Sequence, residues 1–307
     1  MPSLDFLNDF LSASLRLSIP LAFAALGGLL SERSGVLNIG LEGMILTGAF
    51  ASAVVATSSG QAWVGVAIAC LAGAIVGWLH AYLCVGLGVN QLVSGLAINL
   101  AAAGLTTYGA RLMFATGTVA LSGIKPVSIP GLGDLPILGV LFQQDLLFYL
   151  LIALTIGSTY SLFHTHWGLS LRAVGNAPQA ADSAGISVVR IRYFSVVICG
   201  VLCGLAGAYL ALAQVGFFTE NMSAGRGFIA LAALIFGRWH PVATVFACLL
   251  FGTTEALQLR IQAFGLDIPY QLLAMLPYLT ALFALTGIAG KATPPAAIGI
   301  PYDSSKH

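Results

Sequence analysis

Acidic and amide side chains stand inside long apolar runs of this sequence, where each needs a specific partner. Asn38 and Glu42 lie one helical turn apart in one run, and Asn99 lies in another. A carboxylate at the centre of a lipid bilayer costs about 2.5–3.5 kcal/mol on insertion scales. Glu42 therefore lines a path for a polar solute or braces a broken helix beside it. Alternatively, it makes an internal hydrogen bond, for example to Arg33 or Asn99, that fixes helix packing.

A second cluster of candidate residues follows the sixth long apolar run and combines aromatic faces with charges: Phe217, Phe218, Glu220 and Arg226. Such groups can contact a polar solute, although aromatic residues also form ordinary belts at the membrane interface. The Asn99 amide can likewise bond a solute or join two helices. Glu255 and Gln258 favour an internal polar network.

Catalytic and metal-binding patterns do not stand out in the sequence. No Ser-His-Asp set, carboxylate pair or group of metal ligands is evident, so we expect no catalytic residue and no metal. The five cysteines lack the paired spacings of a zinc or redox site, and Cys199 and Cys203 read as small helix-packing residues beside glycines. The nearest approach to a nucleotide-binding loop is Gly290-Lys291-Ala292-Thr293. It fails because Leu285 and Ala292 occupy the required Gly and Ser/Thr positions.

Composition identifies the elements that must position these residues. Charged residues make up 7% of the chain and hydrophobic residues 58%, whereas soluble domains carry roughly 25% charged residues. The apolar runs are continuous and long, unlike the alternating strands of an outer-membrane barrel. A net charge of +1 without a basic cluster excludes nucleic acid as a partner. The sequence predicts an all-α, polytopic protein of the lipid bilayer.

Nine apolar runs are candidates for membrane crossings, and we expect eight to ten in one domain, residues 1–307. The seventh run is too short to cross unaided. The runs lie at 10–30, 36–56, 62–84, 92–115, 145–163, 193–214, 227–237, 241–260 and 271–289. They fall into a first half, about 10–115, and a second half, 193–289, separated by a loop at 164–192 and followed by a tail, 290–307. Nine crossings leave the N-terminus outside and the tail inside.

The loop contains a polar island, 171–186, punctuated by Gly and Pro. Arg172, Arg190 and Arg192 outnumber Asp182 around it, so the positive-inside rule places it in the cytoplasm. Pro178 can begin a short helix, and Gly185 can end it. The island is either a docking helix or an ordinary returning loop.

Two stretches, 31–40 and 223–232, repeat a pattern of Arg and Gly before an apolar run. An odd number of crossings separates them, so the second unit is expected to be inverted relative to the first, with broken helices.

Three separated motifs together resemble one family. They are Glu32-Arg33-Ser34-Gly35-Val36-Leu37-Asn38-Ile39-Gly40-Leu41-Glu42-Gly43-Met44, the island, and the stretch from Gly225 to Trp239. From about Leu21 to Ile288 the chain resembles the permease subunits of bacterial ABC importers for nucleosides and simple sugars. These belong to the branched-chain amino acid and ribose permease group.

The resemblance implies a transport subunit of the bacterial cytoplasmic membrane that is not itself an enzyme. Its partners would be an ABC ATP-binding subunit carrying ATP and Mg, a second related permease and an extracytoplasmic substrate-binding protein. The two permeases would form a heterodimer rather than a homodimer. Nucleosides are the first expected substrates, and simple sugars the second.

The island would then be the helix that couples to the ATPase, through Arg172, Gly175, Asn176, Pro178, Ala180, Ala181, Gly185 and Ile186. The chain departs from the family pattern where Asn176 and Ala177 follow Gly175, which places one polar contact with the ATPase in doubt. A self-sufficient carrier coupled to ions through Glu42 or Glu255 is the alternative. We also expect Gly40, Gly43, Gly48, Ala230, Ala233 and Gly237 to pack against the second permease.

Overall fold

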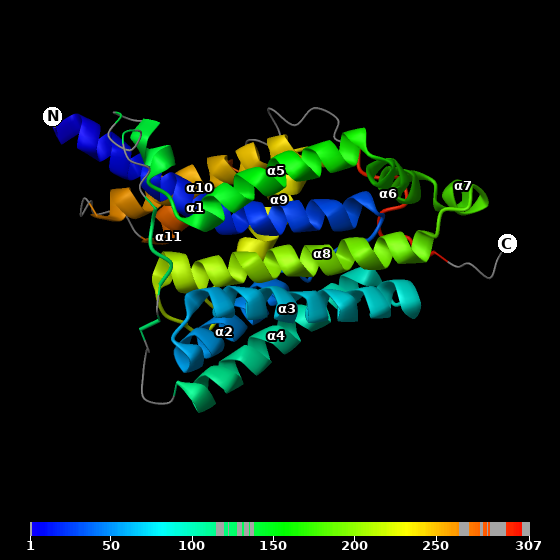
Figure 1. The fold of residues 1–307 in the computed structure, drawn as a ribbon, viewed down its shortest axis with the longest axis horizontal. Helices are drawn as coiled ribbons and strands as arrows, with labels where there is room; N and C mark the ends of the chain where they lie inside the picture. The colour runs from blue at the N-terminus through cyan, green and yellow to red at the C-terminus, as the bar shows by residue number, and fades with distance from the viewer. Residues whose placement is uncertain are drawn as a thin grey trace.

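The computed structural model describes residues 2–114, 138–263 and 293–302, with shorter stretches inside 120–135 and 270–282. The described residues form helices and no strand, as expected (Figure 1). Wider π turns, Tyr82–Gly86 and Tyr209–Val215, continue α3 and α8. The helices are α1 Pro2–Arg33, α2 Leu41–Ser59, α3 Ala62–Ala81, α4 Gln91–Met113, α5 Leu146–His164, α6 His166–Asn176, α7 Pro178–Ser183, α8 Val188–Ala208, α9 Arg226–Phe236, α10 Pro241–Ala263 and α11 Tyr270–Ala274.

Seven of the described helices are long and apolar enough to cross a membrane. The exception among the expected crossings is α9, which has 11 residues, so the prediction of a short seventh run is confirmed. The expected crossing at 271–289 lies largely outside the described residues, as do Lys291 and Lys306. The chain is therefore a multi-pass membrane protein.

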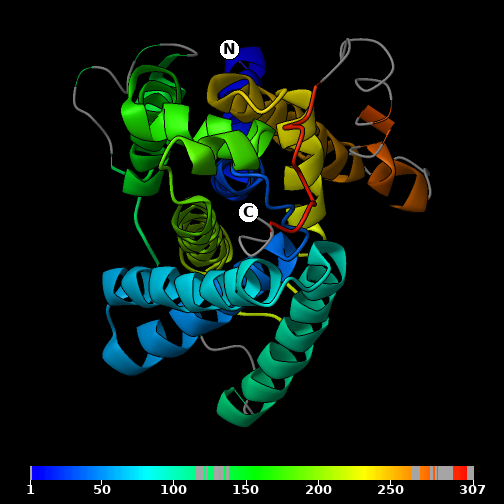
Figure 2. The ribbon, with the colours of Figure 1, turned by 90° about the vertical axis from the view of Figure 1, so that its right-hand side faces the viewer.

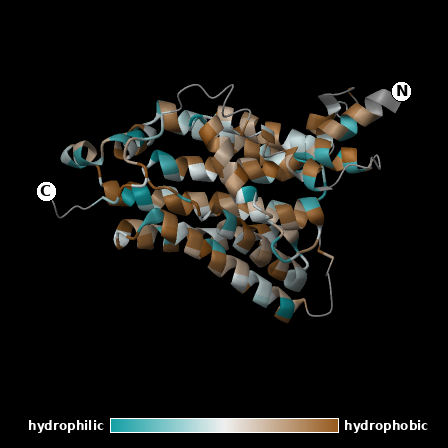
Figure 3. Cartoon of the chain, turned by 180° about the vertical axis from the view of Figure 1, so that it is seen from behind, coloured by the Kyte–Doolittle hydropathy of each residue, from teal (hydrophilic) through white to brown (hydrophobic). Residues whose placement is uncertain are grey.

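Helices α1 and α8 lie antiparallel at the centre of the molecule (Figure 1). Within the molecule lie 83% and 78% of their apolar spans, compared with 28–33% for α3, α4, α5 and α10. The outer helices therefore present apolar side chains outward, including Leu100 and Leu105 on α4. Figure 2 shows α4 leaning away from the other helices toward Met113, and in Figure 3 hydrophilic residues gather around α6 and α7.

Glycines allow α3 and α8 to pack at backbone distance. A methyl group added to Gly73 or Gly200 would collide with the backbone of the other helix, and one on Gly204 would collide with Ala69. Cys199 and Cys203 are buried on the same helix, as expected for helix-packing residues.

Two crossings are broken, and each consists of a non-helical segment followed by a helix. We call residues 34–40, before α2, the inner link, and residues 216–225, before α9, the outer link. The inner link explains why the second crossing becomes helical only at Leu41, whereas its apolar run begins at 36. The pairing of helices is related by the expected inversion: α3 and α2 pack on α8, while α10 and α9 pack on α1.

The two ends of the molecule separate as the charge pattern predicts. Figure 1 places α6, α7 and the C-terminus at one end and the N-terminus at the other. The end with α6 and α7 is called the inner end below, because the positive-inside rule assigns it to the cytoplasm.

Candidate functional site

Glu42 caps the short helix α9 from across the molecule. Its Oε1 accepts hydrogen bonds from the Ser223 hydroxyl at 2.6 Å and the Gly225 N–H at 2.7 Å. Its Oε2 accepts from the Gly227 N–H at 2.6 Å. The side chain is only 8% exposed. The specific partners suggested from sequence, Arg33 and Asn99, are wrong, because Glu42 bonds to the outer link and α9 instead.

This position compensates the charge of Glu42 without a cation in direct contact with the carboxylate. The first N–H groups of a helix lack intrahelical partners and form the positive end of its dipole. Glu42 lies in the first turn of its own helix α2 and also accepts from the first turn of α9. The carboxylate thus lies where the positive ends of two broken crossings meet.

The neighbouring ion pair belongs to the same site. Arg226 begins α9, where the dipole disfavours a cation, and its Nη2 donates to Glu255 Oε1 at 2.6 Å. Both side chains are largely buried, at 14% and 22% exposed. Glu255 therefore contributes to an internal polar network, and Arg226 points to α10 rather than to the outer surface.

The inner link is held by side chains from three other helices. Gln91 Oε1 accepts from the Leu37 N–H at 2.7 Å, and His80 Nε2 lies 3.2 Å from the Leu37 carbonyl. That carbonyl can only accept, so Nε2 carries the proton and Nδ1 accepts from the Ser94 hydroxyl, 3.0 Å away. Arg192 Nε donates to the Ser34 carbonyl at 3.2 Å. Non-helical backbone at membrane depth requires such partners.

The two asparagines named from sequence also hold this link. Asn99 Oδ1 accepts from the Gly43 N–H at 2.8 Å, and its Nδ2 donates to the Ile39 carbonyl at 3.0 Å. Asn38 Oδ1 accepts from the Gly40 N–H at 3.0 Å, and Asn38 is fully buried. In the described residues, then, both amides are engaged with backbone, and Asn99 caps α2 as Glu42 caps α9.

The inner end of α1 clamps the turn between α9 and α10. The Arg33 guanidinium donates to the Trp239 carbonyl at 2.9 and 2.7 Å, and Trp239 Nε1 donates to Glu32 Oε2 at 2.6 Å. Arg238 and Trp239 both have positive φ angles, 50° and 53°. Two bulky residues in the left-handed region need such fixed contacts.

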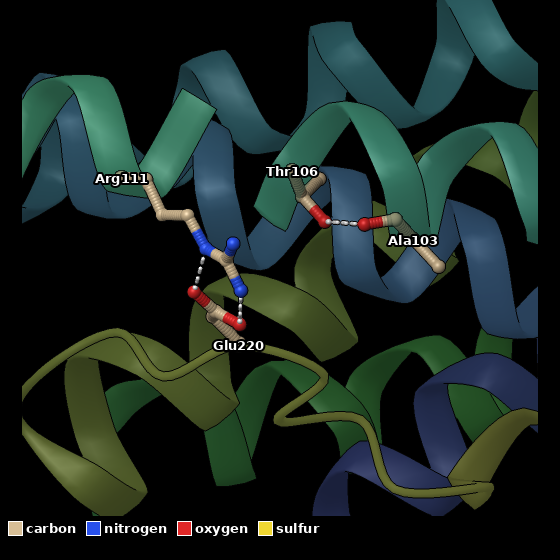
Figure 4. Close-up of polar contacts among 4 residues, drawn as sticks. All are labelled: Ala103, Thr106, Arg111 and Glu220. Carbon is tan, nitrogen blue, oxygen red and sulfur yellow. Dashed lines mark hydrogen bonds and ion pairs between the residues drawn. The ribbon is translucent and has the colours of Figure 1, made fainter. Parts of the chain in front are cut away.

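Phe218 and Glu220 of the outer link reach α4 and α2. Phe218 is buried and its ring packs edge-on against Phe50 at 5.5 Å, with Phe114 at 6.3 Å. Glu220 accepts two hydrogen bonds from Arg111, at 2.8 and 3.1 Å, on the outer surface (Figure 4). The Arg111 hydrogen bonds lower the pKa of the Glu220 carboxyl. Phe217 is half-buried.

A groove of about 310 Å³ lies between α4 and the helices α2 and α3. Its lining is apolar except for Thr47 and Thr106, whose hydroxyls donate to carbonyls of their own helices at 2.7 Å. Thr106 also approaches the Ala103 carbonyl (Figure 4). This groove therefore offers a polar solute few partners.

The island forms two short helices at the inner end, with Thr165 capping α6. Helix α7 begins at Pro178, and Gly185 follows it with φ +83°, so both predicted boundaries are confirmed. Gly175, Pro178 and Ala181 are buried, whereas Asn176, Ala180 and Gly185 are exposed. An open groove of about 380 Å³ runs between the helices, lined in part by Arg172, Ala180, Ala181 and Ile186. Arg172 lies over the Phe163 ring at 5.3 Å.

Family comparison assigns this architecture. Residues 10–285 match the family model described as the permease component of branched-chain amino acid transport systems. The chain belongs to this permease family. It is 40% identical, over 100% of both chains, to the guanosine ABC transporter permease protein NupQ of Bacillus subtilis. Such relatives are membrane components of bacterial ABC transporters, so this permease is a protein of the cytoplasmic membrane.

Two further relatives show the range of the family. The nucleoside ABC transporter permease protein NupC of Lactococcus lactis is 39% identical over 94% of this permease and 95% of its own chain. The glucose ABC transporter permease protein TsgB13 of Haloferax volcanii is 28% identical over 88% of this permease and 74% of its own chain. No solved structure matches this permease.

The expected contact surface of small residues is wrong. Gly40 and Gly43 face α4, Gly48 faces Gly204, and Gly237 faces Thr244, all within this chain. Ala230 and Ala233 are fully buried. These residues pack the broken crossings internally and cannot also contact a second permease.

Sequence reasoning also misplaced Arg192 and missed His80. Arg192 was read as a cytoplasmic surface charge but is 1% exposed. His80, which is fully buried, was not singled out. A lone histidine late in an apolar run was the available signal. Among the described residues, no group of His, Cys, Asp and Glu side chains is placed to hold a metal ion.

Proposed function

We propose that this permease forms the translocation path of an ATP-driven importer of nucleosides. The observation that carries the proposal is the 40% identity to a guanosine transporter permease over the full length of both chains. The second relative, named for nucleosides, is 39% identical over nearly the whole chain. Simple sugars are the second candidate, because a more distant relative is named for glucose.

The proposed assembly supplies what this chain lacks. An ABC ATP-binding subunit would bind ATP and Mg, because the only similar stretch here, at 290–293, departs from a nucleotide-binding loop. An extracytoplasmic substrate-binding protein would deliver the nucleoside. A second, related permease would complete the path, as a heterodimer. Purifying this permease from cells that lack related permeases decides that point, since a functional homodimer would exclude the heterodimer.

Hydrogen bonding speaks against the ion-coupled alternative. The Glu42 carboxylate accepts from two backbone N–H groups and one hydroxyl, and a proton on either oxygen would disturb this arrangement. Glu255 is bonded to Arg226. Both acids suggested for ion coupling are thus engaged in holding α9.

The test is uptake into proteoliposomes that contain the complete complex. We expect labelled guanosine to accumulate only with ATP and the binding protein, and labelled ribose to serve as the sugar comparison. Accumulation of ribose but not guanosine would replace the substrate, and uptake that continues without ATP would overturn the proposal.

The α6–α7 loop is proposed to couple the permease to the ATPase, and Gly185 offers a matched pair of variants. Its φ of +83° favours Gly and tolerates Asn, and no atom stands within 4 Å of an added methyl group. Gly185→Val should therefore strain the loop by about 1 kcal/mol or more and uncouple ATP hydrolysis from uptake. Gly185→Asn should leave coupling intact.

Arg172→Glu is a second test of this loop, because it reverses the charge at the edge of the groove. We expect ATP hydrolysis that substrate no longer stimulates, with the permease still folded in the membrane. Normal stimulation in both Gly185→Val and Arg172→Glu would reject the coupling role.

A further inference from the structure

Residues 293–302, near the C-terminus, cross the inner end of the molecule and join parts far apart in sequence. The Ala297 N–H donates to the Gly175 carbonyl at 2.9 Å, and the Ala296 N–H donates to Asn176 Oδ1 at 3.3 Å. The Gly299 N–H donates to the Gly35 carbonyl at 3.2 Å. One segment therefore bonds both to the end of α6 and to the inner link.

Arg192 fastens this segment from the base of α8. Its Nη1 donates to the Ile300 carbonyl at 3.0 Å, while its Nε donates to the Ser34 carbonyl of the inner link. The buried guanidinium thus bridges the same two pieces of backbone. Burying such a charge is costly without hydrogen-bond acceptors, and these two carbonyls supply acceptors.

The segment also packs against the α6–α7 loop. Val174 on α6, Ala181 on α7 and Val188 on α8 form a small buried cluster, and Tyr302 packs against it. Ala297 is 4% exposed. The segment is therefore seated on the loop by apolar contacts as well as by hydrogen bonds.

We propose that residues 293–302, held by Arg192, form a strap that transmits movement of the α6–α7 loop to the inner link and so to the broken crossing of α2. The proposal rests on the proposed function, since it concerns how an ATPase-driven shift reaches the path. Without the strap, the contact of Gly175 with the Arg33 carbonyl remains as the connection between α6 and the start of this link. Arg192 and the strap act as positioning elements and do not contact substrate.

Gly299 allows the strap to be broken at one exposed residue. Its φ is +76°, and an added methyl group would meet no atom within 4 Å. Gly299→Pro removes the N–H that bonds Gly35 and cannot adopt this φ, whereas Gly299→Asn keeps the N–H and tolerates the left-handed region. A second pair of chains ends at Thr293, without the strap, or at Tyr302, with all of it.

The experiment measures nucleoside transported per ATP hydrolysed in the reconstituted complex. We expect Gly299→Pro and the chain ending at Thr293 to lower this ratio by about fivefold or more, a typical coupling energy, while complex assembly and basal ATP hydrolysis persist. Gly299→Asn and the chain ending at Tyr302 should keep the wild-type ratio. Cross-linking of Asn176→Cys to Ala296→Cys should restrict uptake until reductant is added.

An unchanged ratio in both strap-breaking variants would overturn the strap while leaving the proposed function intact. Failure of the wild-type complex to couple uptake to ATP would instead reject the proposed function itself. If the chain ending at Thr293 does not assemble, Gly299→Pro alone decides the result, because its change is confined to the exposed surface.

Discussion

The two broken crossings hold non-helical backbone inside the membrane by different means. His80, Gln91, Asn99 and Arg192 share the inner link, each bonding a different backbone group in the link or just beyond it. The outer link instead relies on Glu42 for its helix cap. Its chain turns through left-handed residues Asn221, Ala224 and Gly225.

This difference separates distributed from concentrated support. Loss of one partner of the inner link leaves the others in place, whereas loss of Glu42 removes three acceptor contacts at once. Segments with few buried partners open at lower free energy than the rest of a structure. We therefore expect the outer link to be the more easily reorganised of the two.

Glu42→Ala should break this comparison most strongly. It leaves the Ser223 hydroxyl and the Gly225 and Gly227 N–H groups without their acceptor, and each unsatisfied buried group costs about 1–3 kcal/mol. We expect a loss of about 3 kcal/mol or more in stability, measured as the apparent Tm of the purified permease. Glu220→Ala, which removes an exposed carboxylate, is the control. A Tm equal to wild type in Glu42→Ala would contradict the capping role.

Glu42→Gln should have a smaller effect. The amide oxygen replaces one carboxylate oxygen, but the amide N–H groups face a backbone donor, so we expect a loss of about 1–3 kcal/mol. Uptake should remain measurable, because ATP and not a protonated acid drives transport. Abolished uptake at normal protein levels, together with collapse of wild-type uptake by an uncoupler while ATP stays high, would favour the ion-coupled carrier.

Asn99→Ala tests the distributed support of the inner link. It removes the bonds to Gly43 and Ile39, and we expect a loss of about 1–2 kcal/mol, since other side chains still hold the link. The readout is the apparent Tm beside that of Glu42→Ala. A larger loss in Asn99→Ala than in Glu42→Ala would reverse the ranking of the two links.

The Arg111–Glu220 pair should contribute least, because both side chains are substantially exposed, at 71% and 45%. The pKa of Glu220 is lowered from 4.5, so the carboxylate form predominates in the folded state above that value. As the pH falls through the lowered pKa, the pair is lost. Hydrogen exchange of residues 216–225 should then increase, and Glu220→Gln should show this increase at neutral pH. Equal exchange in Glu220→Gln and wild type would show that the pair does not restrain the link.

Local pattern sufficed for the features that depend on neighbours in sequence. Apolar run length predicted the crossings and the short α9, because a bilayer requires a minimum helical span. Pro178 and Gly185 predicted the bounds of α7, because each residue restricts or permits particular backbone angles. The polar island could likewise be placed outside the hydrocarbon.

Partner identity could not be read in this way. Glu42 and Gly227 are 185 residues apart, and Arg33 contacts Trp239 across 206 residues. Small residues such as Gly48 and Ala233 suggested a surface for another chain, although they are buried within this one. A small side chain permits close packing but does not specify which helix approaches it.

The sequence by itself determined that this chain crosses a membrane many times, has a polar loop outside the hydrocarbon and contains charges that need partners within the membrane. Hydrophobicity and backbone preference act locally, so they are visible without coordinates. Only the tertiary structure decided that Glu42 caps α9, that Arg192 lies beneath the C-terminal strap, and that two inverted, broken crossings meet at their helix N-termini. These features depend on which helices pack together, because the backbone groups of a non-helical link must find their hydrogen-bond partners elsewhere in the fold.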